Sequence, residues 1–134
     1  MKQIYSIDEI NILDIKIDKP SIVFLTWDLW AGKTTLSKHI INTILDVDES
    51  VTSPTYTYYN KYESKKYWAV YHFDLYRLGN YDEFFAIWGE EIFDNNTGII
   101  LVEWPQLIAK YYTPDIDIHL HKTNREDTRI LEIK

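Results

Sequence analysis

Hydrophobic and polar positions follow two different spacings along the chain, and each spacing predicts an element. Residues 21–25 contain a continuous apolar run, which is typical of a parallel strand covered on both faces. From Lys33 onward the apolar side chains recur at helical spacing and form one face, at Leu36, Ile40, Ile41, Ile44 and Leu45. The pattern therefore predicts a strand, a short polar turn and an amphipathic helix in direct succession.

The segments on either side add further expected elements. Residues 1–7 read as an edge strand, residues 6–9 have the Ser-x-x-Glu form of a capping box, and residues 13–17 alternate like a half-buried strand. The later expected strands are 56–62, 67–73, 99–102, 116–120 and 130–133, and Asn80 is expected to cap a short helix between the second and third of them. This order predicts an α/β fold with a mainly parallel central sheet, flanking helices and antiparallel additions, which residues 1–134 build as a single domain.

Composition and charge exclude several classes of function. The net charge of −7 argues against binding a polyanion over the whole surface, so a nucleic acid would be met locally or through another protein. The absence of cysteine excludes disulfides and thiolate chemistry. No apolar run approaches the length of a membrane span and residues 1–20 do not read as a secretory signal, so we expect a cytoplasmic protein without a membrane segment.

The turn between the first buried strand and its helix carries the most specific motif. It ends Ala31-Gly32-Lys33-Thr34-Thr35, and after a strand and before a helix this sequence indicates a phosphate-binding loop and a P-loop NTPase-like fold. In such a loop the backbone N–H groups and the positive end of the helix hold a phosphate. Lys33 would reach the β- and γ-phosphates, and the Thr34 hydroxyl would ligate Mg²⁺.

The loop departs from this pattern at its first glycine, because position 27 is tryptophan. A bulky residue there costs about 1–3 kcal/mol if the backbone needs a conformation that only glycine adopts easily. It would also crowd a nucleotide. A loss of 3 kcal/mol weakens binding by roughly two orders of magnitude.

Nucleotide hydrolysis also needs a carboxylate at a strand end, and two strands supply one. Asp74 follows an aromatic run and Glu103 follows four apolar residues, both at the carboxyl ends where ligand sites gather in α/β sheets. Asp74 is equally well explained as a turn residue. Glu103 borders a core, where a carboxylate usually has a partner or a role. Together with Lys33 and Thr34 they favour a nucleotide site.

Three other clusters have a functional and a plain interpretation. Residues 52–55 are rich in hydroxyls, as in segments that sense the γ-phosphate, although an ordinary loop explains the composition alone. His119 and His121 share one strand face at a spacing that can bind metal, but two histidines without a third ligand are more often a solvated face. A group of tyrosines suits base stacking, yet a packed aromatic strand is favoured in so acidic a chain: Tyr56, Tyr58, Tyr59 and Tyr62.

Four motifs follow one another in a fixed order within residues 21–106. They are Asp28-Leu29-x-Ala31-Gly32-Lys33-Thr34-Thr35, Ser53-Pro54-Thr55-Tyr56, His72-Phe73-Asp74-Leu75-Tyr76-Arg77 and Glu103-Trp104-Pro105. In this combination the chain resembles the TsaE family, also called YjeE. These are small bacterial P-loop ATPases of the machinery that makes threonylcarbamoyladenosine next to the anticodon of tRNA.

The resemblance implies a role for each motif residue. The residues that would bind ATP are Asp28, Leu29, Trp30, Ala31, Gly32, Lys33, Thr34, Thr35 and Trp104. The residues implied in catalysis are Glu103 as the acid needed for hydrolysis, Asp74 as the metal-side carboxylate, Lys33, and Thr55 in a switch segment. The implied Mg²⁺ ligands are Thr34 and Asp74, with Glu103 as a third candidate.

The resemblance also implies partner proteins. The family docks on a dimer of TsaB and TsaD, and its ATPase cycle resets that transferase rather than performing the transfer. We therefore expect contact with tRNA only indirectly or through the complex.

Tryptophan stands where the family pattern has glycine at Trp27, Trp30 and Trp88. Trp30 occupies a free position of the general loop pattern, and Gly89 is expected to supply the turn glycine that Trp88 replaces. Glycine and tryptophan codons can differ by one base, so one cause can explain all three. The first hypothesis is therefore a Mg²⁺-dependent ATPase subunit impaired by Trp27. The alternatives are a partner-binding subunit that has lost nucleotide and, ranked last, a small-molecule P-loop kinase.

Overall fold

A single seven-stranded sheet organises the computed structural model, which describes residues 1–13, 15–28, 33–54 and 57–134, with only the backbone of residues 33 and 34. The strand order is β1-β7-β6-β2-β5-β4-β3. The strands are β1 (Lys2–Ser6), β2 (Ser21–Trp27), β3 (Tyr59–Ser64), β4 (Trp68–Asp74), β5 (Ile99–Glu103), β6 (Ile116–Lys122) and β7 (Thr128–Ile133). The four central strands β6, β2, β5 and β4 run parallel, while β3, β7 and β1 join antiparallel at the two sides. The predicted fold class is confirmed.

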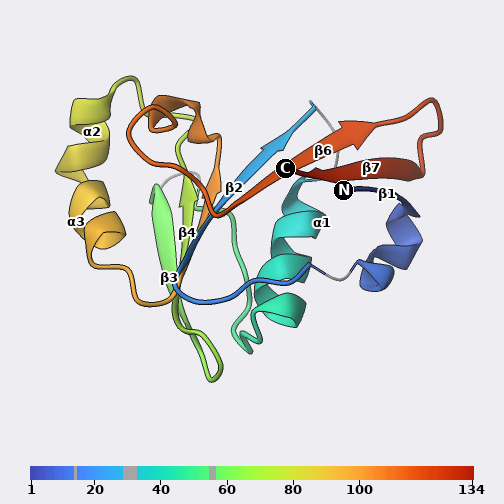
Figure 1. The fold of residues 1–134 in the computed structure, drawn as a ribbon, viewed down its shortest axis with the longest axis horizontal. Helices are drawn as coiled ribbons and strands as arrows, with labels where there is room; N and C mark the ends of the chain where they lie inside the picture. The colour runs from blue at the N-terminus through green and yellow to red at the C-terminus, as the bar shows by residue number, and fades with distance from the viewer. Residues whose placement is uncertain (14, 29–32, 55–56) are drawn as a thin grey trace.

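Helices cover both faces of the sheet (Figure 1). On one face α1 (Lys33–Lys38) continues without a break into a π-helical segment η2 (His39–Ile44), and on the other lie α2 (Tyr81–Ala86) and α3 (Gly89–Asp94). Two short 3₁₀ helices, η1 (Ile7–Ile12) and η3 (Pro105–Leu107), complete the elements. The two termini lie side by side, because the amino group of Met1 donates to the carbonyl of Ile133 at 3.0 Å (Figure 1).

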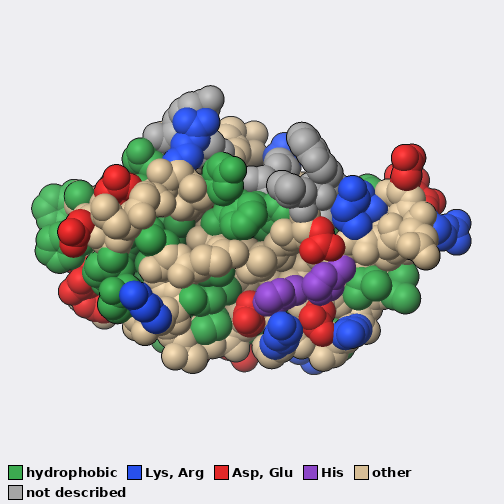
Figure 2. Space-filling view, turned by 90° about the horizontal axis from the view of Figure 1, so that it is seen from above, with side chains coloured by type: hydrophobic (Ala, Val, Ile, Leu, Met, Phe, Trp, Pro, Cys, Tyr) green, Lys and Arg blue, Asp and Glu red, His purple; other side chains and the backbone are tan. Residues whose placement is uncertain are grey.

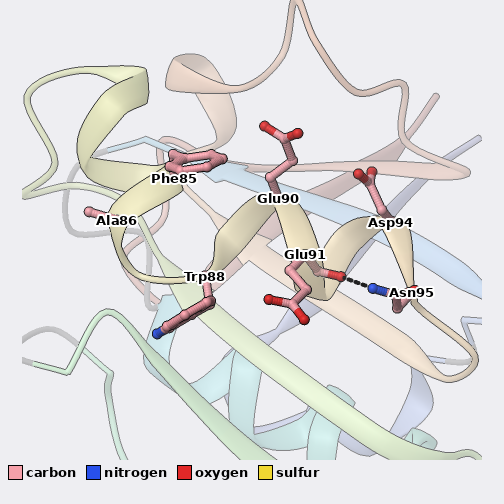
Figure 3. A pocket seen from close by; sticks show the side chains of 7 residues that line it. All are labelled: Phe85, Ala86, Trp88, Glu90, Glu91, Asp94 and Asn95. Carbon is pink, nitrogen blue, oxygen red and sulfur yellow. Dashed lines mark hydrogen bonds between the residues drawn. The ribbon is translucent and has the colours of Figure 1, made fainter.

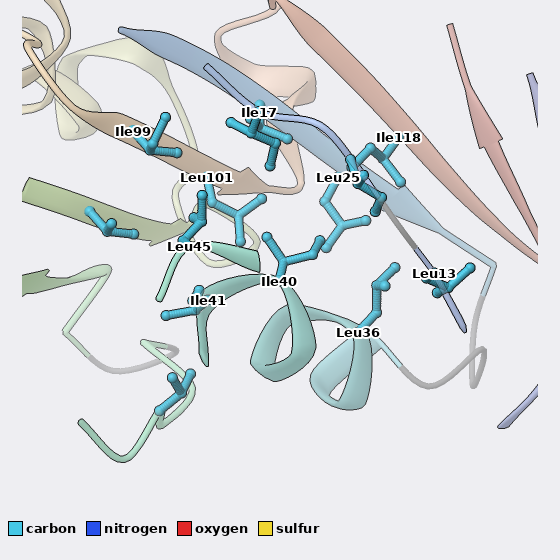
Figure 4. Packing of buried hydrophobic residues seen from close by; sticks show 14 of the residues in the cluster. Leu13, Ile17, Leu25, Leu36, Ile40, Ile41, Leu45, Ile99, Leu101 and Ile118 are labelled. Atoms are coloured by element: carbon cyan, nitrogen blue, oxygen red, sulfur yellow. The ribbon is translucent and has the colours of Figure 1, made fainter. Parts of the chain in front are cut away.

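Alternation along the strands divides the core into two layers. Val23 and Leu25 of β2 face α1, where the predicted helix face of Leu36, Ile40 and Ile41 is fully buried against them (Figure 4). Phe24 of β2 faces the opposite way, toward an aromatic layer under α2 and α3 that includes Phe73, Phe84 and Phe93. The continuous apolar run that predicted a strand buried on both faces is explained by these two layers.

The segment before β2 corrects two predictions. Leu13, Ile15 and Ile17 are buried, as their alternation suggested, but the described residues 13 and 15–17 are not part of a strand. Their side chains instead cover the α1 face of the sheet, and the Leu13 carbonyl lies 3.3 Å from Nε2 of the buried His39. Ser6 precedes η1 as expected, yet its side chain makes no capping hydrogen bond. The alternating burial of Leu13, Ile15 and Ile17 therefore results from packing in the core layer beside α1 and η2 rather than from strand pairing.

The turn between α2 and α3 corrects a third prediction. Asn80 caps α2 as expected, accepting from the Glu83 amide at 3.0 Å. Gly89, however, does not replace the glycine expected at position 88, because Trp88 itself takes the left-handed conformation with φ 68°. Gly89 is instead needed for packing, since a Cβ there would lie 2.4 Å from the Phe84 ring.

Within the part of the chain that the structure describes, no helix combines the length and the apolar character that crossing a bilayer requires.

Candidate nucleotide site

The carboxyl ends of β2, β4 and β5 bring the predicted site residues together. Trp27, Asp74 and Glu103 are the last residues of these three strands, and alternation points all three side chains to the face that α1 covers. Asp74 and Glu103 are paired in the register of β4 and β5, and each is only 2 % exposed. The two carboxylates that the sequence singled out are therefore neighbours at one buried edge of the sheet.

Glu103 is held by groups from two other elements. Its Oε1 accepts a hydrogen bond of 2.7 Å from the Ser37 hydroxyl of α1, and this contact is buried. Its Oε2 lies 3.2 Å from Nε2 of His72, a buried side chain two residues before Asp74 on the same face of β4. A carboxylate can be kept in a core when polar groups of this kind replace water around it.

Asp74 is positioned by the chain that follows its own strand. Its Oδ1 accepts from the Tyr76 amide at 3.1 Å, which forms the turn after β4. The backbone N–H of Asp74 donates to the Tyr58 carbonyl, and the Leu75 N–H extends the ladder to the carbonyl of Glu103. Asp74 is therefore a turn residue, as one of the two interpretations predicted, and its carboxylate also lies on the strand paired with Glu103.

The hydroxyl-rich segment after the first helix approaches the same carboxylate. Val51, Thr52 and Ser53 line a small cavity of about 10 Å³ together with Ser37, Lys38, His72 and Glu103. That volume corresponds to about one water molecule. Thr55 and Tyr56 lie outside the described residues, so the structure brings residues 51–53 of the predicted switch segment to Glu103 and does not describe its last part.

Three aromatic rings form a row beside the carboxylates. The Trp27 and Trp104 ring centres are 5.0 Å apart in an edge-on arrangement, and the Tyr76 and Trp104 ring centres are 5.2 Å apart in a tilted one. Trp27 is buried, its backbone is paired with Leu120 of β6 in an extended strand, and its φ is not positive. The glycine-only conformation considered for position 27 is therefore not adopted, and the indole is accommodated by stacking on Trp104.

The phosphate loop itself is described only at its two ends. Asp28 directly follows β2, and its Oδ2 accepts a hydrogen bond of 3.1 Å from the Lys122 amide at the end of β6. Leu29, Trp30, Ala31 and Gly32 lie outside the described residues, and α1 begins at Lys33 and Thr34 immediately after them. Thr35 is exposed on the first turn of α1. The strand, the loop and the helix thus occur in the predicted order at the sheet edge that holds Asp74 and Glu103.

Ser37 and His72 are polar members of this site that the sequence interpretation missed. Each could have been found by periodicity. Ser37 lies one helical turn after Lys33, and His72 lies one strand repeat before Asp74, so each shares a face with a predicted site residue.

The histidine pair lies on the surface, away from these carboxylates. His119 contacts Asp117 at 3.2 Å, and His121 lies 3.3 Å from Glu132 and 3.8 Å from Asp28. Histidine, acidic and basic side chains gather on this face of the molecule (Figure 2). Among the described residues no group of three or more potential ligands could hold a metal ion. The solvated-face interpretation of His119 and His121 is the one the geometry supports.

The residues at the sheet edge fit a magnesium nucleotide chemically. A divalent cation would offset the negative charge of a phosphate brought to this edge. Mg²⁺ is commonly bound through one or two carboxylates and substrate phosphates, which is the donor set that Asp74 and Glu103 provide. Lys33 and Thr34 begin α1, the helix whose Ser37 donates to Glu103, and the N-terminus of a helix is suited to holding a phosphate.

Comparison with known proteins gives a consistent result. The profile of the family described as "Threonylcarbamoyl adenosine biosynthesis protein TsaE" matches residues 6–131. Proteins named tRNA threonylcarbamoyladenosine biosynthesis protein TsaE are similar in sequence: one from Rickettsia conorii is 31% identical over 85% of this chain and 73% of its own, and one from Haemophilus influenzae is 34% identical over 91% and 75%. The crystal structure of Bacillus subtilus YdiB is similar in fold, with a TM-score of 0.65, 25% identity, and coverage of 98% of this chain and 82% of that one.

Proposed function

Because the chain belongs to the TsaE family of tRNA threonylcarbamoyladenosine biosynthesis proteins, we propose that it is the ATP-binding and ATP-hydrolysing subunit of that machinery. The observation that carries the proposal is the pairing of Asp74 with Glu103 at a buried sheet edge, where Glu103 accepts a hydrogen bond from Ser37 of α1, the helix that begins at Lys33. A phosphate loop, a metal-side carboxylate and a second acid are the parts that phosphoryl transfer to water needs.

In this proposal each residue has one task. Lys33 contacts the β- and γ-phosphates, while Thr34 and Asp74 hold Mg²⁺, which offsets phosphate charge when bound. Glu103 orients a water molecule for attack on the γ-phosphorus and accepts its proton as the bond to the β-phosphate oxygen breaks, giving ADP and phosphate. Ser37 fixes one oxygen of Glu103, so the other oxygen points toward His72 and the small cavity.

The remaining motif residues complete the nucleotide site. Asp28, residues 29–32 and Thr35 bind the phosphates in this proposal, and Trp104 packs beside the nucleotide. The segment that contains Thr55 closes on the γ-phosphate, a role that the approach of residues 51–53 to Glu103 supports. The partners in this proposal are TsaB-like and TsaD-like proteins, through which the chain meets tRNA only indirectly.

A partner-binding subunit without nucleotide is the second candidate, and one contact favours it. Trp27 stands at the first glycine position of the loop pattern, and its indole occupies space beside Trp104 at the edge where the nucleotide would lie. If the indole blocks the site, the fold and its partner surface remain while turnover is lost.

Steady-state ATP hydrolysis with a TsaB–TsaD dimer present tests the proposal. We expect Mg²⁺-dependent turnover that falls by about 100-fold or more in Lys33→Ala and in Glu103→Gln, because each removes a positioned catalytic group. Glu126→Gln is the matched control, since it removes an exposed carboxylate far along the chain in the β6–β7 turn. Turnover that survives Glu103→Gln unchanged would remove Glu103 from the mechanism, and a chain that does not co-elute with the dimer would contradict the pathway role.

A further inference from the structure

Two exposed tryptophans hold a backbone conformation that disfavours large side chains. Trp68 and Trp88 have φ of 65° and 68°, in the left-handed region where the Cβ crowds the following carbonyl. Their side chains are 61 % and 66 % exposed, so packing against the core does not hold them there. Glycine adopts this conformation without the Cβ penalty, whereas a bulky residue in it is an outlier.

The position of Trp88 is one that glycine usually fills. Ile87 is the C-cap of α2, and Trp88 follows it with φ 68° and ψ 17° and donates its N–H to the Phe85 carbonyl at 3.1 Å. This is the left-handed residue that ends many helices, most often a glycine. Figure 3 shows the indole at the junction of α2 and α3, beside a surface hollow that it shares with Phe85, Glu90 and Glu91.

The position of Trp68 has the same character in a hairpin. Ser64 of β3 and Trp68 of β4 are paired across the turn formed by residues 65–67. Trp68 is therefore the residue at which the turn enters β4, with φ 65°, and glycine is the residue that suits a left-handed position of this kind. The Nζ of Lys19 lies 3.8 Å from the centre of the Trp68 ring, but Trp68 remains exposed to solvent.

Trp104 shows what a tryptophan needs to hold such a conformation. Its φ is 56°, yet its ring is partly buried and contacts the rings of both Trp27 and Tyr76. Local packing therefore stabilises the left-handed backbone at Trp104. Trp68 and Trp88 have positive φ without comparable packing.

Composition points in the same direction. The chain has five tryptophans and four glycines, whereas the usual glycine content of about 7% predicts about nine glycines in a chain of this length. Two more tryptophans, Trp27 and Trp30, stand at loop positions where the family pattern has glycine. Tryptophan is thus in excess at the positions where glycine is missing.

We propose that the backbone at positions 68 and 88 is built for glycine, and that the protein made in its native cell carries glycine there and at positions 27 and 30, where the loop pattern has glycine. A single codon that is translated as tryptophan in the printed sequence, but as glycine in that cell, explains positions 27, 30, 68 and 88 together. Trp104 is encoded by the ordinary tryptophan codon. Glycine at position 27 would restore the first glycine of the loop and remove the indole from the phosphate site, a consequence that rests on the proposed ATP-binding function. The backbone conformations at positions 68 and 88 are independent of that function.

Urea unfolding of paired variants tests the backbone part. Trp68→Gly and Trp88→Gly are compared with Trp68→Ala and Trp88→Ala, which remove the same indole but keep a Cβ. We expect each glycine variant to have a folding equilibrium constant about tenfold larger than its alanine counterpart, because only glycine relieves the left-handed backbone.

Phe85 is the matched control, an exposed aromatic residue within α2 that is absent from the positive-φ residues. There the order reverses, and Phe85→Gly is less stable than Phe85→Ala, since glycine weakens a helix interior. Glycine variants no more stable than alanine variants at both 68 and 88 would overturn the proposal.

Peptide mass spectrometry of the protein purified from its native cells tests the identity of the four residues directly. We expect glycine at positions 27, 30, 68 and 88 and tryptophan at 104. Tryptophan at any of the four positions overturns the shared-codon proposal. This outcome is independent of nucleotide binding: native glycine at positions 27 and 30 without any ATP affinity would leave this proposal standing and contradict the proposed function.

Discussion

Glu103 is the side chain on which the local chemistry converges. It ends a strand whose five residues are all buried, and an ionised carboxylate in such surroundings is unfavourable unless other polar groups replace its water. Ser37 supplies one such group from α1, and His72 lies against the second oxygen from β4. The same contacts that make Glu103 tolerable in the core also fix the direction of its oxygens, which a water-positioning acid needs.

Ser37→Ala measures the strength of this arrangement. We expect a loss of about 1.5–3 kcal/mol in the free energy of unfolding, because the substitution removes a buried hydrogen bond to a carboxylate. Urea unfolding is the measurement, and Ser50→Ala, at an exposed position, should stay within about 0.5 kcal/mol of the parent. A loss at Ser37 no larger than at Ser50 would mean that the contact does not hold Glu103.

Among these side chains, the sequence could predict Asp74 and Glu103 because a carboxylate directly after an apolar run marks a strand end. Periodicity places Ser37 and His72 on the same faces as Lys33 and Asp74, but only the structure shows that both side chains contact Glu103. The sequence also could not show that Trp27 packs on Trp104, because that contact joins residues far apart in the chain.

Side chains of the β6–β7 hairpin connect Asp28, at the start of the predicted phosphate loop, with the edge strand β1. Asp28 follows β2, accepts from the Lys122 amide at the end of β6, and lies 3.8 Å from His121. His121 also contacts Glu132 of β7, and Glu132 lies 3.6 Å from Lys2 of β1. A chain of side chains thus runs across four strands from the start of the loop to the edge strand.

The pH dependence of stability reports on this chain. The hydrogen bond with His121, followed by the charges of Lys2 and Lys134, lowers the pKa of Glu132 below its usual value of 4.5. A pKa that is lower in the folded state stabilises the protein above the unfolded value and ceases to do so as the pH falls through the folded value. We therefore expect the parent to be more stable than Glu132→Gln at about pH 6, with the difference disappearing in acid.

Urea unfolding at a series of pH values measures this difference, and Glu126→Gln in the β6–β7 turn provides the same chemical change away from the contact. A constant gap between parent and Glu132→Gln down to acid pH would contradict the role of the carboxylate charge.

Most elements were predictable because their patterns were local. The apolar run of β2, the alternation of β6 and the cap at Asn80 each depend on a few neighbouring residues. Residues 13–17 were misjudged because alternation shows only that one side is buried, and not whether another strand pairs with the backbone. The turn at Trp88 was misjudged because a backbone conformation suited to glycine was taken up by tryptophan itself.

Across the whole molecule, strand order decides where function lies. The parallel strands β2, β5 and β4 end at one edge, so residues far apart in sequence meet there without any further device. The antiparallel strands extend the sheet away from this edge, and α2 and α3 cover the opposite face from α1. We therefore propose that ATP binds at the edge beside α1 where Asp74 and Glu103 are paired.

Calorimetric titration of Mg²⁺-ATP into this chain, Trp27→Gly, and Trp27→Gly with Lys33→Ala tests that location most directly. We expect saturable one-site binding to Trp27→Gly, loss of binding when Lys33 is also replaced, and affinity up to roughly two orders of magnitude weaker when the indole is present. No binding to any of the three proteins, or binding that survives Lys33→Ala, would contradict a nucleotide site at this edge of the sheet.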